Sequence, residues 1–328
     1  MNNLKKIGLT ALAGSLVAVS AANAIEMTAN GKAKITYVDE AGGNAVAAGD
    51  VTGNPYGYEQ AISFTASGET EIGTASLYFK HEAGSVGSSF INFDMGDAGQ
   101  VSMETGSYGL AGLNAYKDVL PRAGGAEQAW DDTDGDAFLL AQADATNMFG
   151  YRNSVAGFDI TASYAKNGGS AHEDDSNADA GDDSDKTIVV STSSLMDGLT
   201  VGAGYGKLDD ADSEDIEKHS TVFAKYAMGP VTVGYQFAEI NEAGNDSQAN
   251  MFGVSFNVNE NIAISWNQRD VEIGDGSAGL SDQEDTGIAA SYTMGGMSLS
   301  AFQNKSDNVG GTTGKEDEVT QVTLSFSF

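Results

Sequence analysis

Apolar and polar residues alternate along most of this sequence. Residues 27–38, 158–166 and 199–208 are examples, with similar side chains at every second position. Because successive side chains of a β-strand point to opposite faces, the pattern predicts strands with one apolar and one polar face. The alternating segments come in pairs, each pair joined by a short turn and followed by a longer polar connection. About sixteen such strands, each of roughly ten residues, are predicted, which is the length a tilted strand needs to cross a membrane.

The alternation of short and long connections favours one fold class. Outer-membrane barrels have an even number of strands, short periplasmic turns and longer external loops. A soluble β-sandwich uses fewer strands for one domain. The chain also has no cysteine, so an exported protein of this sequence must rely on a large core or a closed sheet and not on disulfides. We therefore predict an all-β, transmembrane antiparallel β-barrel that is too wide for its own side chains to fill.

The N-terminal residues have the pattern of an export signal. Lys5 and Lys6 precede an apolar segment, residues 7–19, and Ala22-Asn23-Ala24 matches a cleavage site. Residues 1–24 are predicted to be a signal peptide that is removed. Residues 25–328 are predicted to form a single barrel domain.

One long segment, from about residue 106 to 145, interrupts the alternation. Its first part, Tyr108 to Pro121, has the spacing of a short helix, and Glu127 to Asp136 is an acidic run. A long connection without regular structure inside a compact domain is either functional or evidence against the assignment. We interpret it as a functional insertion between the fifth and sixth strands.

The charge of the chain is strongly acidic. It has 16 basic and 47 acidic residues, a net charge of −31; without Lys5 and Lys6 the counts are 14 and 47, or −33. This balance disfavours nucleic acid as a partner. It favours cations near the surface, within a Debye length of roughly 8 Å at physiological salt. The alternative is that the acidity only maintains solubility in a salty habitat.

Motifs for catalysis are missing from the sequence. The three histidines are far apart, and no Gly-x-Ser-x-Gly pattern occurs. The chain is therefore predicted not to be an enzyme, and no cofactor is expected apart from a loosely bound Ca²⁺. The candidate ligands for Ca²⁺ are Asp132, Asp134 and Asp136, which resemble the opening of a calcium-binding loop. The bidentate Glu of that loop is absent, and a solvent-exposed acidic run is the alternative interpretation.

Several features together resemble the general diffusion porins of Gram-negative bacteria. They are the leader ending in Ala22-Asn23-Ala24, eight hairpins, the insertion between the fifth and sixth strands, and the terminal Leu-Ser-Phe-Ser-Phe, residues 324–328. The resemblance implies a sixteen-stranded, homotrimeric, water-filled barrel in the outer membrane. It also implies that the long third loop folds into the lumen and that Phe328 is an assembly signal. The second loop, His81–Gly87, is shorter than the family's subunit latch.

The resemblance further implies that acids of the third loop face basic residues across the narrowest section. The candidates on the loop are Asp118, Arg122, Glu127, Asp131, Asp132, Asp134 and Asp136. The candidates on the lumen wall are Lys32, Lys34, Arg152 and Arg269. Alternatively, much of the acidic run faces solvent at the outer mouth.

The expected function is passive diffusion of small hydrophilic solutes and ions, with a preference for cations. Outer-membrane lipid and lipopolysaccharide are the expected surroundings. The alternative is a closed or plugged outer-membrane barrel that acts as an adhesin or structural protein through its acidic external loops.

Overall fold

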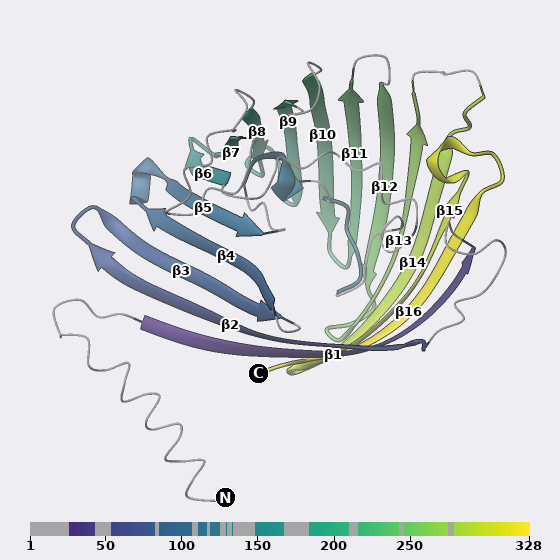
Figure 1. Ribbon diagram of the computed structural model, residues 1–328, viewed down its shortest axis with the longest axis horizontal. Coiled ribbons are helices and arrows are strands. Elements are labelled where there is room, and N and C mark those ends of the chain that lie inside the picture. The colour runs from purple at the N-terminus through teal and green to yellow at the C-terminus, as the bar shows by residue number, and fades with distance from the viewer. Residues whose placement is uncertain are drawn as a thin grey trace, which may run out of the picture.

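Strands form nearly all of the regular structure in the computed structural model of this protein (Figure 1). The structure describes residues 26–42, 54–82, 85–106, 111–116, 119–124, 129, 133, 148–166, 184–209, 216–242, 246–274 and 279–328. The predicted signal peptide and most of the acidic run 127–136 lie outside these residues. No helix in the described ranges is long and apolar enough to cross a membrane.

Sixteen strands follow one another along the chain. The first eight are β1 (Glu26–Gly42), β2 (Tyr56–Thr70), β3 (Gly73–Glu82), β4 (Ser85–Asp94), β5 (Gln100–Gly106), β6 (Met148–Val155), β7 (Phe158–Lys166) and β8 (Ser184–Thr192). The next eight are β9 (Leu199–Asp209), β10 (Ile216–Met228), β11 (Val231–Asn241), β12 (Ser247–Asn257), β13 (Ile262–Glu272), β14 (Gln283–Met294), β15 (Met297–Asp307) and β16 (Glu316–Ser327). Among the described residues, three short 3-10 helices occur: η1 (Gly96–Ala98), η2 (Gly112–Tyr116) and η4 (Val309–Gly311).

The sheet closes on itself. Each strand pairs antiparallel with the next, and β16 pairs with β1, with Phe326 opposite Ala33. The last residue completes the seam, because Phe328 and Gly31 each donate a backbone hydrogen bond to the other, at 2.9 and 3.1 Å. Closure leaves no strand with an unpaired edge. The prediction of a sixteen-stranded antiparallel barrel is confirmed.

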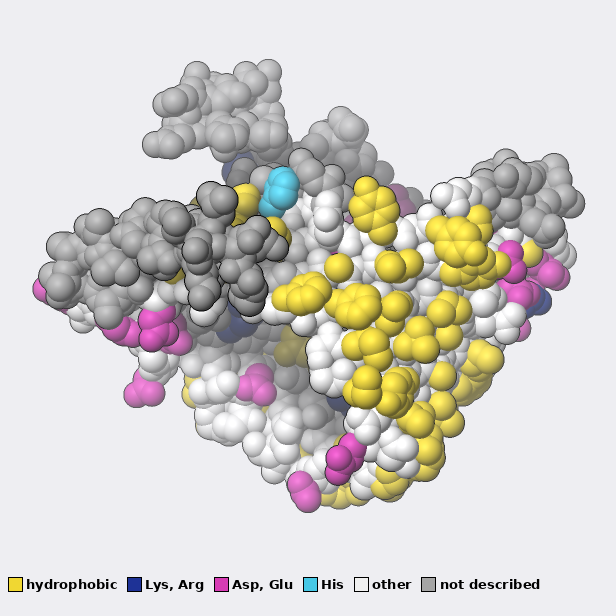
Figure 2. All heavy atoms as spheres, turned by 90° about the horizontal axis from the view of Figure 1, so that it is seen from below, with side chains coloured by type: hydrophobic (Ala, Val, Ile, Leu, Met, Phe, Trp, Pro, Cys, Tyr) yellow, Lys and Arg dark blue, Asp and Glu magenta, His cyan; other side chains and the backbone are white. Residues whose placement is uncertain are grey.

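The two faces of the wall have opposite character. On β13, Ile264 points outward and is 45% exposed, whereas Asn267 points inward and is 3% exposed. Figure 2 shows hydrophobic side chains gathered in a band on the outer surface, with acidic side chains at its borders. An apolar exterior with a polar interior is the reverse of a soluble domain and suits a barrel in a bilayer.

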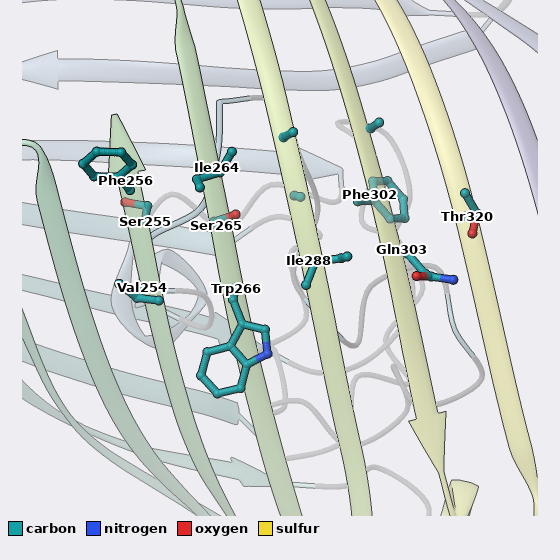
Figure 3. Close-up of a pocket in the computed structure, with 13 residues that line it drawn as sticks. Val254, Ser255, Phe256, Ile264, Ser265, Trp266, Ile288, Phe302, Gln303 and Thr320 are labelled. Carbon is teal, nitrogen blue, oxygen red and sulfur yellow. The ribbon is translucent and has the colours of Figure 1, made fainter. Parts of the chain in front are cut away.

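A depression of about 620 Å³ lies on the outer wall across β12 to β16 (Figure 3). Val254, Trp266 and Ile288 line it, and the small side chains of Ala290 and Ala301 leave space between them. All five positions belong to the outward face of their strands. The depression is therefore part of the apolar exterior and not of the pore.

The two ends of the barrel differ in their connections. Ala156-Gly157 and Gly229-Pro230 are two-residue turns at one end, where the chain terminus at Phe328 also lies. Most connections at the other end are longer, including residues 107–147, 167–183 and 210–215; the connection between β3 and β4, residues 83–84, is the exception. By the usual arrangement of these barrels, the short turns are periplasmic and the long connections external.

The alternation over residues 186–195 predicts a strand as far as Leu195, but β8 ends earlier, at Thr192. The hydroxyl of Thr192 donates a 2.6 Å hydrogen bond to the carbonyl of Gly157 and accepts one from the backbone N–H of Ser194. A threonine side chain that bonds to nearby backbone in this way competes with the strand ladder. The apolar Leu195 and Met196 therefore belong to the turn.

Candidate pore lining and constriction

The described residues between β5 and β6 lie against the polar inner face of the barrel. The backbone N–H of Gly112 donates to Thr161 Oγ1 on β7 at 2.9 Å, and that of Leu113 donates to Thr187 Oγ1 on β8 at 3.0 Å. Gly112 has φ +64°, and a Cβ there would lie 1.8 Å from Thr187 Oγ1. The helix η2 can therefore approach the wall this closely only with glycine at position 112.

Apolar packing holds η2 in the same place. The side chain of Leu113 packs against Val189 and Phe223, and the ring of Tyr116 stacks on Phe223 with centroids 5.3 Å apart. A Cβ at Gly204 or Gly206 of β9 would lie 2.6 Å from a methyl group of Leu113. These two glycines of β9 thus provide the space for Leu113.

Replacing Gly206 by valine should therefore destabilise the barrel or displace η2. The new side chain would overlap Leu113 Cδ1 and press on Thr187 Cγ2, 3.0 Å from the added Cβ. Overpacking of this kind costs about 1–3 kcal/mol. The urea midpoint for unfolding of the refolded protein measures the effect. Gly31→Val is the matched control, since this strand glycine faces outward with its nearest contact at 3.4 Å; equal midpoints would contradict the proposed packing.

The segment continues along the wall past η2. Pro121 and Leu120 lie against the glycines of β11 and β12, where a Cβ at Gly234 would be 2.6 Å from Pro121 Cδ. Gln236 of β11 donates to the carbonyl of Tyr116 at 2.9 Å. Small residues on these strands therefore accommodate the loop, as they do on β9.

The later described residues of the segment between β5 and β6 reach strands β13 and β15. The backbone N–H of Ala123 donates to Ser265 Oγ at 2.9 Å, and that of Ala129 donates to Asn267 Oδ1 at 2.7 Å. The hydroxyls of Thr133 and Ser306 lie 2.8 Å apart. Most of these bonds use loop backbone donors, so polar side chains of the wall fix the path of the segment from β7 to β15.

The predicted basic wall residues of β1 point inward and have an acidic neighbour. Lys34 Nζ donates to Glu59 Oε2 at 2.6 Å, and Lys32 Nζ lies 4.0 Å from the other oxygen of that carboxylate. Lys80 and Glu82 form a further ion pair on β3. Strands β1 to β3, which carry these ion pairs, lie outside the part of the wall to which the described loop residues form hydrogen bonds.

Arg152 of β6 also has a carboxylate partner. Its Nη2 donates to Glu104 Oε1 at 3.1 Å, and Ser102 Oγ donates to the same oxygen at 2.6 Å. Arg152 further lines a recess of about 450 Å³ together with Tyr116 of the loop, Asp94 and Asp159. The recess brings the loop and the wall together on the inner face of β4 to β7.

Arg269 of β13 is buried, with 1% of its side chain exposed. Its Nε donates to Asp285 Oδ2 of β14 at 2.7 Å. Gln283 donates to both oxygens of the same carboxylate, at 3.0 and 3.1 Å, and accepts from the backbone N–H of Gly310. This network joins two strands to the connection that carries η4.

Among the predicted loop residues, the structure describes Arg122, which is exposed. Asp118, Glu127, Asp131, Asp132, Asp134 and Asp136 lie outside the described residues. The three candidate Ca²⁺ ligands are in that group, and the described residues contain no cluster of three or more His, Asp or Glu side chains suited to a metal.

The carboxylates that neighbour the basic wall residues were not predicted. Glu59, Glu104 and Asp285 occupy polar positions of alternating segments, so their inward direction could be read from the sequence. The basic partner of each carboxylate could not be read from the sequence, because the pairing depends on the register between neighbouring strands.

The barrel is closed, with an apolar exterior and a polar interior, and the described residues between β5 and β6 lie along its inner wall. This architecture is that of the outer-membrane diffusion channels. The chain belongs to the Gram-negative porin family, whose sequence pattern matches residues 8–328. It is thus an outer-membrane protein of a Gram-negative bacterium. The family and the fold are those of non-enzymatic channels.

Solved porin structures share this fold at low sequence identity. A porin structure refined at 1.8 Å resolution is 17% identical, with a TM-score of 0.62 over 92% of this chain and 100% of the other. Salmonella typhi OmpF in complex with daunomycin is 15% identical, with a TM-score of 0.64 over 92% and 97%. An anion-selective porin from Comamonas acidovorans is 14% identical, with a TM-score of 0.65 over 93% and 100%. No curated protein matches the chain.

Proposed function

We propose that the barrel conducts small hydrophilic solutes and ions by passive diffusion and prefers cations. One observation carries the proposal: the described loop residues are fixed to the inner wall from β7 to β15. The inner face of β1 to β6 remains as the other side of the water path. The pore is then narrowest between this loop and that face, and the charges at this level control what passes.

The preference for cations follows from the balance of charges. The inward basic residues Lys32, Lys34, Lys80 and Arg152 each have a carboxylate within 4.0 Å. These cations are therefore largely offset, while the chain as a whole carries −31. A lumen with an excess of acidic groups concentrates cations. The anion selectivity of the Comamonas acidovorans porin belongs to that protein, since the shared fold leaves charge free to vary.

The acidic loop residues remain candidates for the constriction. Asp131 and Asp132 stand in the sequence between Ala129 and Thr133, both of which bond to the inner wall. Glu127 stands in the sequence between Ala123 and Ala129, and both of these alanines also bond to the inner wall. Short spans between fixed points limit how far the chain can extend. We propose that these acids, with Asp118, Asp134 and Asp136, contribute to the cation preference.

Planar-bilayer recording of the refolded protein tests the channel and its selectivity. Stepwise conductance is expected, and under a KCl gradient the reversal potential should have the sign of K⁺ selectivity. Changing Asp131, Asp132, Asp134 and Asp136 together to asparagine should move the reversal potential toward zero. A reversal potential that stays the same would show that these acids are not at the constriction. The absence of conductance steps would favour the plugged barrel.

We further propose that the protein is exported, cleaved after Ala24 and assembled as a homotrimer. The side chain of Phe328 is 79% exposed at the seam between β16 and β1, which is accessible to assembly machinery. Intact-mass measurement of the protein from membranes identifies the N-terminus, and native mass spectrometry reports the number of subunits.

A further inference from the structure

The recess beside Arg152 carries charges of both signs. Its lining comes from β4 to β7, which are neighbours in the wall (Figure 1), and from Tyr116 of η2. The charged residues of this lining are Arg152 of β6, Asp94 of β4, Asp97 of η1 and Asp159 of β7. We call this space of about 450 Å³ the periplasmic recess, because it borders the short turns of the barrel.

Strand register places the arginine of the recess between two carboxylates. Arg152 is directly opposite Thr161, and Asp159 lies two positions from Thr161 on the same inner face. Diagonal neighbours of this kind are about 7–8 Å apart. On the other side, Gln100 of β5 stands between Arg152 and Asp94. Two strand spacings separate that pair by about 10 Å. The recess therefore presents one positive centre with a negative centre on either side.

Polar side chains of β5 hold the guanidinium in position. Glu104, with 1% of its side chain exposed, accepts from Arg152 Nη2 at 3.1 Å and from Ser102 Oγ at 2.6 Å. Gln100 Oε1 accepts from Arg152 Nη1 at 3.5 Å. The side chain of Arg152 remains 28% exposed where it lines the recess. Because a guanidinium has five N–H donors, it can bind the carboxylate of a solute in addition to that of Glu104.

The carboxylates on either side of the arginine are also held by hydrogen bonds. Ser154 Oγ donates to Asp159 Oδ1, and the backbone N–H of Gly96 donates to Asp94 Oδ1 at 2.9 Å. Both aspartates are exposed, so their carboxylates are accessible to a solute. A carboxylate binds an ammonium group through charge-assisted hydrogen bonds. The recess thus offers a place for a cationic group close to a place for an anionic one.

We propose that the periplasmic recess binds a zwitterionic solute of the size of an amino acid or a dipeptide. The carboxylate of the solute binds Arg152, its ammonium group binds Asp159, and Tyr116 contacts its carbon atoms. A simple amine would use only the acidic residues, whereas a zwitterion uses both kinds of charge. Small-ligand sites commonly have volumes of about 300–1,000 Å³, a range that includes the recess. The inference rests on the proposed function and deepens it, because it names a class of solute.

Binding of L-alanyl-L-alanine to the refolded barrel in detergent, measured by saturation-transfer NMR, tests the proposal. Asp159→Asn keeps the acceptor for Ser154 but removes the charge, so Kd should rise about 5-fold. The matched control is Asp197→Asn, which removes an exposed carboxylate from the β8–β9 turn at the same end of the barrel and should leave Kd unchanged. Arg152→Lys keeps a positive charge beside Glu104 but lacks the planar set of donors, so it should also weaken binding.

Two capped forms of the dipeptide test the two charges separately. The methyl ester lacks the carboxylate and the N-acetyl form lacks the ammonium group, so each should bind more weakly than the free dipeptide. Equal affinity of Asp159→Asn and Asp197→Asn would overturn the proposal, and so would a methyl ester that binds as tightly as the free dipeptide. Heat-modifiable migration on a gel checks that each variant is folded.

Stepwise conductance in KCl, recorded in parallel, tests the channel itself. A barrel that conducts KCl but does not bind the dipeptide contradicts only the inference about the recess. A barrel that binds the dipeptide without conducting contradicts only the proposed channel function.

Discussion

Deleting residues 123–136 should raise the single-channel conductance, roughly two-fold if the loop sets the narrowest section of the pore. The deletion removes the bonds from Ala123 to Ser265, from Ala129 to Asn267 and from Thr133 to Ser306. The helix η2 keeps its own attachments at Gly112 and Leu113, so the remaining loop stays against β7 and β8. Current through the refolded protein in planar bilayers measures the change.

A deletion of equal length elsewhere provides the control. Residues 169–182 belong to the connection between β7 and β8, at the same end of the barrel. Their removal should leave the conductance near that of the unmodified protein. If both deletions change conductance equally, the β5–β6 segment does not limit the pore. If deletion of residues 123–136 has no effect, the narrowest section lies elsewhere in the barrel.

Removing the carboxylate of Asp285 should lower the free energy of unfolding by about 3–5 kcal/mol, because it removes a carboxylate partner of a buried arginine. Arg269 and Asp285 have 1% and 0% of their side chains exposed, and their atoms are 2.7 Å apart. Gln283 would also lose both of its hydrogen bonds to that carboxylate. Asp285→Ala should therefore lower the urea midpoint of the barrel strongly.

A partly exposed pair on the next strand supplies the comparison. Asp307 lies 2.7 Å from Lys305, but 34% of its side chain is exposed. Exposed ion pairs contribute about 0–1 kcal/mol, so Asp307→Ala should change the midpoint little. The double variant Arg269→Met with Asp285→Leu should recover much of the loss, because it removes both buried charges. Equal effects of Asp285→Ala and Asp307→Ala would show that burial of the pair does not matter.

The alternation of the sequence predicts the strands well. The bounds of β7, Phe158–Lys166, agree with the predicted ones, and β9, Leu199–Asp209, differs by one residue. The error in β8 has a local cause, since the hydroxyl of Thr192 bonds to the turn and ends the strand. An apolar residue such as Leu195 fits the alternation equally well whether it is in a strand or in a turn.

The inner attachments of the loop could not be predicted. The bond from Ala129 to Asn267 joins residues 138 positions apart, and that from Gly112 to Thr161 joins residues 49 apart. The glycines of β9 can be read from the sequence, but no local pattern shows that Leu113 packs against them. Such contacts depend on the course of a segment across several strands.

By itself, the sequence determined the fold class and which side chains face the lumen, because both depend on a period of two along each strand. It also indicated where the wall is interrupted, between β5 and β6. Only the tertiary structure decided which residues meet, because a shift of one residue in register changes every cross-strand pair. The partnership of Arg269 with Asp285 and the position of Arg152 between Asp94 and Asp159 are both consequences of that register.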